Sequence, residues 1–68
     1  MTDEFRRGDV VILRHGIPED GIEPGTRAVV VDVHRHPRLA YEVEVVDQGS
    51  GETRWWGSVV PENLEPAT

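Results

Sequence analysis

Asp32, His34 and His36 occupy alternate positions in one stretch of the chain. Because side chains two apart on a β-strand point to the same face, a carboxylate and two imidazoles at this spacing make a partial site for Zn²⁺ or another divalent metal. A third strong ligand to complete the site is missing nearby, and side chains about 6–7 Å apart along a strand rarely converge on one ion. Pro37 also ends the strand before His36 is fixed. We therefore expect no metal site and no cofactor.

The same segment has a second interpretation, as a solvated basic loop on an acidic protein. The loop consists of His34, Arg35, His36 and Arg38. It could steer an acidic partner, and protonation of the histidines near about pH 6.5 would strengthen it. It is too small to read a nucleic-acid sequence.

The adjacent Trp55 and Trp56 carry the most information about binding. Successive side chains on a strand point to opposite faces, so the two cannot share one core. Pairing the surrounding segments through a loop at 47–51 sets Val43 opposite Trp55 and makes Glu44 and Arg54 an outward pair of opposite charge. A shift by one residue would put the guanidinium on the core face, at a cost of several kcal/mol. Trp56 therefore faces outward.

An outward Trp is typical of interface hot spots, so we expect a protein partner to bind around it. The candidate partner-binding residues are Trp56, with Tyr41 and Arg54 near it, and Ile17 and Ile22 in the long loop before the second strand. In the alternative interpretation, Phe5 and the N-terminal arm, or the long loop, cover Trp56 and close a second small core.

Catalytic constellations are absent from the sequence. Ser50 and Ser58 lack the strand–turn–helix context of a nucleophile elbow, and the segment 49–51 is a hairpin turn rather than a phosphate loop. Glu42 and Glu44 fall on an outward strand face, where carboxylates are solvated. We therefore expect that the chain is not an enzyme.

Composition limits the remaining classes. The chain has 68 residues, 13 acidic and 7 basic side chains, a formal net charge of −6, no Cys and no Lys. A single domain, 1–68 with a core of about 5–66, is all that fits. A chain without Cys suits a reducing cytoplasm, and no apolar run approaches the ~20 residues of a membrane span, so we expect a cytoplasmic protein that binds no membrane. The acidic balance disfavours nucleic acid.

The elements that must position these residues are strands, because the stretches free of Gly and Pro are short and rich in Val and Ile. The class is all-β. The four expected strands are Asp9–Arg14, Thr26–His34, Ala40–Val46, and 52 to about 56, and a short fifth strand can follow Leu64. An ordered long loop covers 15–25, and one 3₁₀ turn is expected at 60–64.

This order of elements resembles the small SH3-like barrels. A closer resemblance is carried by Asp9–Leu13, Ile17–Ile22, Gly25, Val29–Val33, Ala40–Asp47, Gly51–Thr53 and Leu64–Pro66. Through them the chain is similar to short bacterial proteins grouped as domain of unknown function number four-nine-two-six. It departs from their pattern at Ala28, where Gly is usual, and at Trp55–Ser58, where those proteins are aliphatic.

A looser similarity links the chain to the SH3-like domain of nitrile hydratase β subunits. It is carried by Phe5, Gly8, Asp9, Val33, His34, Tyr41, Trp56, Gly57 and Asn63–Pro66. In that family the metal-binding cysteines belong to the other subunit, so the resemblance implies an accessory role without catalysis.

Three functions follow as expectations. The first is a non-enzymatic interaction or accessory module that binds a protein, a more basic one by charge, through the outward aromatic face. The second is a nucleic-acid or ribosome-associated barrel, and the third is an accessory subunit of a metallo-hydratase-like complex. A homodimer, in which outward Trp56 is buried against a second copy, is a further expectation.

Overall fold

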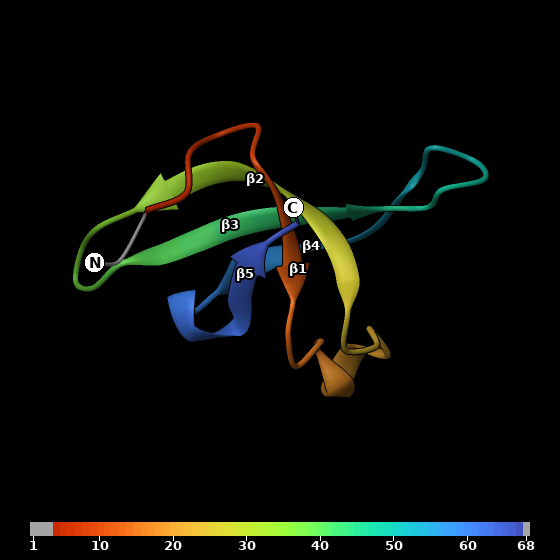
Figure 1. Ribbon diagram of the computed structural model, residues 1–68, viewed down its shortest axis with the longest axis horizontal. Helices are drawn as coiled ribbons and strands as arrows, with labels where there is room; N and C mark the ends of the chain where they lie inside the picture. The colour runs from red at the N-terminus through yellow and green to blue at the C-terminus, as the bar shows by residue number, and fades with distance from the viewer. Residues whose placement is uncertain (1–3, 68) are drawn as a thin grey trace.

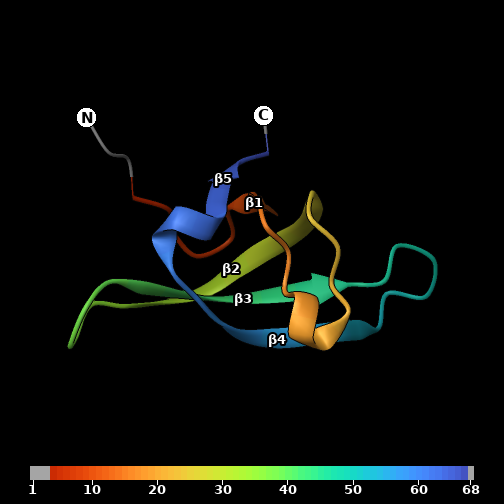
Figure 2. The same ribbon diagram turned by 90° about the horizontal axis from the view of Figure 1, so that it is seen from below.

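The computed structural model describes residues 4–67, and all of its extended structure belongs to one antiparallel sheet. The strands are β1 (Val10–Leu13), β2 (Thr26–His34), β3 (Ala40–Val46), β4 (Thr53–Val59) and β5 (Leu64–Pro66), and two 3₁₀ helices are η1 (Pro18–Asp20) and η2 (Pro61–Asn63). The order in the sheet is β4-β3-β2-β1-β5. The sheet bends, so that β1 and β5 lie across one face of the long β2–β3–β4 layer (Figure 1, Figure 2).

The all-β class, the meander and the short fifth strand are confirmed, and η2 lies where a 3₁₀ turn was expected. β1 is one residue shorter at each end than the expected Asp9–Arg14, and β4 begins at Thr53 instead of 52. β4 continues to Val59 instead of ending near Trp56, because Gly57 stays in the ladder opposite Val43. The long loop contains η1, which the sequence analysis did not predict. No helix within residues 4–67 is long and apolar enough to cross a membrane.

The alternation of side chains along β3 organises the core. Tyr41, Val43 and Val45 point inward and are buried, whereas Glu42 and Glu44 point outward. Two other buried members of the core, Ile17 and Ile22, come from the long loop. The rest come from β1, β2, β4 and β5, and they are Val11, Leu13, Ala28, Val30, Val59 and Leu64. The partly buried residues packed against them are Phe5, Val33, Leu39 and Trp55.

A β-bulge in β2 changes which of its side chains face outward. Val30 pairs with an inward residue of β3, but Asp32 pairs with outward Glu42, so Val31 is the extra residue. Without this insertion, the alternation that buries Val30 would also point Asp32 toward the core. After the bulge, Val33 packs against the core and Asp32 lies on the outer face.

A second bulge, in β4, corrects the register expected from the sequence. Trp55 lies opposite Val45 rather than Val43, and Glu44 lies opposite Trp56 rather than Arg54. The expected Glu44–Arg54 pair is therefore wrong. The guanidinium nevertheless stays out of the core, as expected, because Arg54 is the extra residue of the bulge and is exposed.

Trp55 points inward, as expected, and is half-buried. Its ring lies over Gly57, where an added Cβ would come within 2.7 Å of two ring carbons. Its indole N–H donates to Asp20 Oδ2 at 2.8 Å, which ties β4 to η1. Gly57 thus provides the space that lets the indole lie along the inner face.

The long loop is closed on itself by a pair of backbone hydrogen bonds. Ile17 N–H donates to Ile22 O at 2.8 Å, and Ile22 N–H donates to Ile17 O at 3.1 Å. The two side chains are 8% and 4% exposed and belong to the core. Their assignment as partner-binding residues is corrected here, because a partner could reach almost none of their surface.

Gly16 and Gly21 allow a matched test of this loop, since both have a left-handed φ, of 63° and 72°. A Cβ at Gly16 would lie 2.2 Å from Ile22 O, whereas a Cβ at Gly21 meets nothing within 4 Å. We expect Gly16→Ala to lower the free energy of unfolding by about 3 kcal/mol or more, and Gly21→Ala by about 1–2 kcal/mol, the cost of the left-handed backbone alone. Urea unfolding of both variants measures the difference, and equal losses would contradict the loop packing.

Candidate functional site

A row of side chains crosses the outer face of four strands. Trp56 lies opposite Glu44, Glu44 opposite Val29, and Val29 opposite Val10. Trp56 is 54% exposed and Val10 44%, so the row ends in apolar surface on both sides. A shallow hollow of about 320 Å³ lies along it, lined by Val10, Arg27, Ala28, Val29, Glu44, Val46 and Gln48. From β4 to β1, the row therefore presents an aromatic ring, then a carboxylate, then aliphatic surface.

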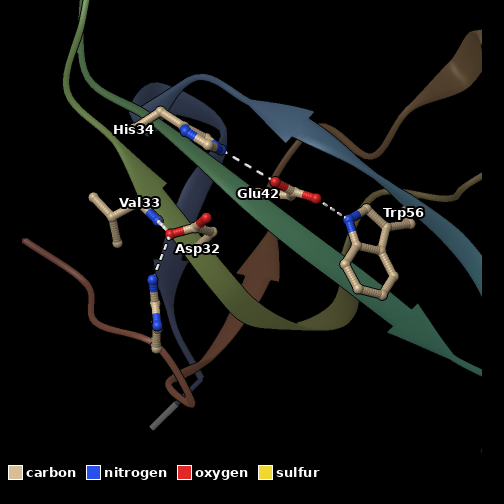
Figure 3. Close-up of polar contacts among 6 residues, drawn as sticks. Asp32, Val33, His34, Glu42 and Trp56 are labelled. Atoms are coloured by element: carbon tan, nitrogen blue, oxygen red, sulfur yellow. Dashed lines mark hydrogen bonds and ion pairs between the residues drawn. The ribbon is translucent and has the colours of Figure 1, made fainter.

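Glu42 lies beside this row and connects Trp56 to His34. Trp56 donates its indole N–H to Glu42 Oε2, and Glu42 Oε1 lies 3.1 Å from His34 Nε2 (Figure 3). Both neighbours lower the pKa of the Glu42 carboxyl below its usual 4.5, the Trp56 hydrogen bond having the larger effect and the His34 hydrogen bond the next. At neutral pH Glu42 is therefore a carboxylate held between two rings.

Asp32 lies opposite Glu42 in the β2–β3 ladder. Its Oδ1 accepts the Val33 N–H at 2.8 Å and an Arg7 N–H at 3.1 Å. The backbone bond is the larger cause, and the Arg7 bond the second, of a pKa below the usual 3.8. Ligating atoms of Asp32, His34 and Glu42 all lie within 4.8 Å of one another.

The basic loop is partly neutralised. His34 is hydrogen-bonded to Glu42, and Arg35 forms an ion pair with Glu4 at 2.9 Å. His36 and Arg38 are exposed beyond the end of β2. The sequence predicted four basic side chains in one patch, and the structure brings two of them to carboxylates.

Of the sequence-predicted partner residues, Trp56 and Arg54 are exposed and Tyr41 is buried. Phe5 does not cover Trp56. It packs edge-on against Tyr41, with ring centroids 5.5 Å apart, and its N–H donates to the Tyr41 hydroxyl at 3.1 Å. Because Trp56 is 54% exposed, the alternative in which Phe5 or the long loop covers it is wrong, and the remainder of the N-terminal arm, 1–3, lies outside the described residues. Tyr41 supports the surface from inside without belonging to it.

Sequence reasoning missed two parts of this face. Val10 and Val29 were not assigned to a face, and only the pairing of β1 with β2 places them in line with Glu44. Glu42 was not recognised as a neighbour of Asp32 because their pairing depends on the bulge in β2. Two-residue alternation in the sequence contains no signal for that bulge.

The comparison with protein families identifies relatives of the whole sheet. The model of a family described as a domain of unknown function (DUF4926) matches residues 8–66, which include all five strands. The chain belongs to this family. The resemblance to DUF4926 is thus confirmed. No curated protein and no solved structure matches the chain, and the similarity to nitrile hydratase β subunits stays a prediction.

The lowered pKa values of this DUF4926 chain predict its stability in acid. A carboxyl whose pKa is lower in the folded state stabilises the fold above its usual pKa and loses that effect as pH falls through the lowered value. For Glu42 the loss begins below about pH 4.5. We expect Glu42→Gln, which keeps an oxygen for Trp56 but cannot titrate, to flatten the fall of Tm with pH in this range.

Thermal unfolding from neutral pH to below about pH 3 measures this dependence. Part of the dependence of Tm on pH remains in the variant, because Asp32 and Asp47 have lowered pKa values of their own. Glu62→Gln is the control, because Glu62 accepts no side-chain hydrogen bond within residues 4–67. A Glu42→Gln profile that parallels the control would show that the Glu42 contacts do not form.

Proposed function

We propose that this DUF4926 chain is a cytoplasmic, non-enzymatic interaction module that binds a basic segment of a protein partner across its outer face. The observation that carries the proposal is the exposed Trp56, whose indole is fixed by Glu42 at the end of the row through Glu44, Val29 and Val10. Trp is the residue most typical of interface hot spots, and an indole already held in one orientation loses little freedom on binding.

The chemistry of the neighbours favours a basic partner. Glu42 and Glu44 flank the indole on β3, and the chain carries a net charge of −6. A Lys or Arg placed over the ring would gain a cation–π contact and a nearby carboxylate together. The hollow beside Val10 and Val29 fits an apolar side chain of the same segment.

The same charge argues against a second copy of the chain as the occupant. Two outer faces brought together would oppose Glu42 and Glu44 to their own copies, and like charges placed directly opposite are destabilising. β4 is an edge of the sheet, but its bulge at Arg54 interrupts the regular edge that another strand would need. The homodimer stays a prediction that sedimentation velocity can test.

The experiment uses the immobilised full chain and a lysate of the native host at low and high salt, with identification of retained proteins and nucleic acid. A basic protein retained by the wild type and by Glu62→Gln is then purified and its affinity measured by calorimetry. We expect Trp56→Ala to weaken binding about 30-fold or more, the equivalent of a hot spot of about 2 kcal/mol. Glu44→Gln should weaken binding less and make it less sensitive to salt.

Two results would contradict the proposal. In the first, the retained protein binds Trp56→Ala as tightly as the wild type. In the second, the retained material is nucleic acid that is lost at high salt and depends on Arg38 instead of Trp56, which would favour the nucleic-acid function. Circular dichroism of each variant confirms that the fold is intact.

A further inference from the structure

We propose that Asp32, His34 and Glu42 form a binding site for a divalent transition-metal ion, with Zn²⁺ as the ion that their chemistry fits best. The three side chains come from two adjacent strands, and one ligating atom of each lies within 4.8 Å of the others. Zn²⁺ holds nitrogen and oxygen ligands at about 2.0–2.2 Å, so tetrahedral ligand atoms lie roughly 3.3–3.6 Å apart. His34 Nε2 and Glu42 Oε1, at 3.1 Å, are already near that spacing.

Each carboxylate has one oxygen held by a hydrogen bond from outside the cluster, and its other oxygen faces the cluster or is left without such a bond. Glu42 Oε2 accepts the Trp56 indole N–H, and Asp32 Oδ1 accepts the Val33 backbone N–H. In metal sites, hydrogen bonds of this kind orient the ligands and raise their affinity for the ion. Within residues 4–67, both hydrogen bonds to the Asp32 carboxylate end on Oδ1, which leaves Oδ2 for a cation.

The ligand set distinguishes between classes of ion. An imidazole nitrogen with two carboxylates suits Zn²⁺ and its neighbours among the transition metals, whereas Mg²⁺ and Ca²⁺ prefer oxygen ligands throughout. A metal ion needs an unprotonated Nε2, so on binding the proton of the His34 Nε2–Glu42 Oε1 hydrogen bond leaves to solvent, and the bound imidazole carries its single proton on Nδ1, away from the ion. Arg7, the competing cation on Asp32, has a side chain 75% exposed and can turn into solvent.

Three protein ligands leave the fourth tetrahedral position open to water. The site lies on the surface, with 47% of the His34 side chain and 28% of the Glu42 side chain exposed, so an ion can enter without opening the fold. The metal site does not depend on the proposed protein partner, because the experiment on either proposal can fail while the other succeeds.

The test is a calorimetric titration of the untagged full chain with Zn²⁺ alone at neutral pH. We expect one ion per chain for the wild type and for the controls His36→Gln and His15→Gln, two histidines outside the cluster. His34→Gln and Asp32→Asn should each weaken binding by at least the roughly 10–100-fold that loss of an outer-shell partner costs. The His34 and Asp32 side chains are 47% and 38% exposed, and His15 and His36 are exposed, so none of the four belongs to the core. Thermal unfolding confirms that the variants fold.

A second readout separates the site from weak surface binding. The Trp56 indole N–H signal in a ¹H–¹⁵N spectrum should move on addition of Zn²⁺, because its acceptor becomes a metal ligand, and the Trp55 signal should not. The proposal is overturned if the wild type shows no saturable binding up to about 1 mM Zn²⁺, if His34→Gln binds as the wild type does, or if His36→Gln abolishes binding.

Discussion

Charged side chains cannot be left unpaired in the core of a domain of this size, and two β-bulges meet that constraint on the two sides of β3. In β2 the extra residue is Val31, and the strand then carries Asp32 and His34 on its outer face. In β4 the extra residue is Arg54, and the strand then carries Trp55 inward and Trp56 outward. Because β3 itself alternates regularly, its inward residues contribute to the core, while Glu42 and Glu44 point outward. On the outer face Glu42 lies opposite Asp32, and Glu44 lies opposite Trp56.

Glu42 is therefore the centre of the outer face. It accepts the Trp56 indole on one side and His34 on the other, and it lies opposite Asp32 in the ladder. A basic side chain of a partner and a metal ion would both be attracted to this carboxylate. Binding at the face thus depends on backbone register, because a slip by one residue would exchange its carboxylates for the apolar side chains of the core.

The sequence was sufficient for the parts of the structure that depend on composition and alternation. Val-rich stretches bounded by Gly and Pro predicted the strands, and the need to keep a guanidinium out of the core predicted that Trp56 faces outward. The register was not predictable in the same way. A bulge needs only one inserted residue, and the regular pairing also leaves Trp55 inward and Trp56 outward, so side-chain alternation alone does not distinguish the two registers.

The long loop shows the same limit. Ile17 and Ile22 were expected to bind a partner, and the sequence did not show that their burial would remove them from any binding surface. Tyr41 likewise was expected to bind a partner beside Trp56, whereas it is buried, and its contact with Phe5 joins residues 36 positions apart in the chain. Long-range contacts of this kind leave no local pattern.

The most direct test of this arrangement is a nuclear Overhauser spectrum of the ¹⁵N-labelled chain, observed at the two indole N–H protons. The structure predicts contacts from the Trp56 indole N–H to the Glu42 side chain, and from the Trp55 indole N–H to Asp20 in η1. Contacts from Trp56 to η1, or from Trp55 to Glu42, would show that β4 is turned the other way, and would contradict the outer face described above.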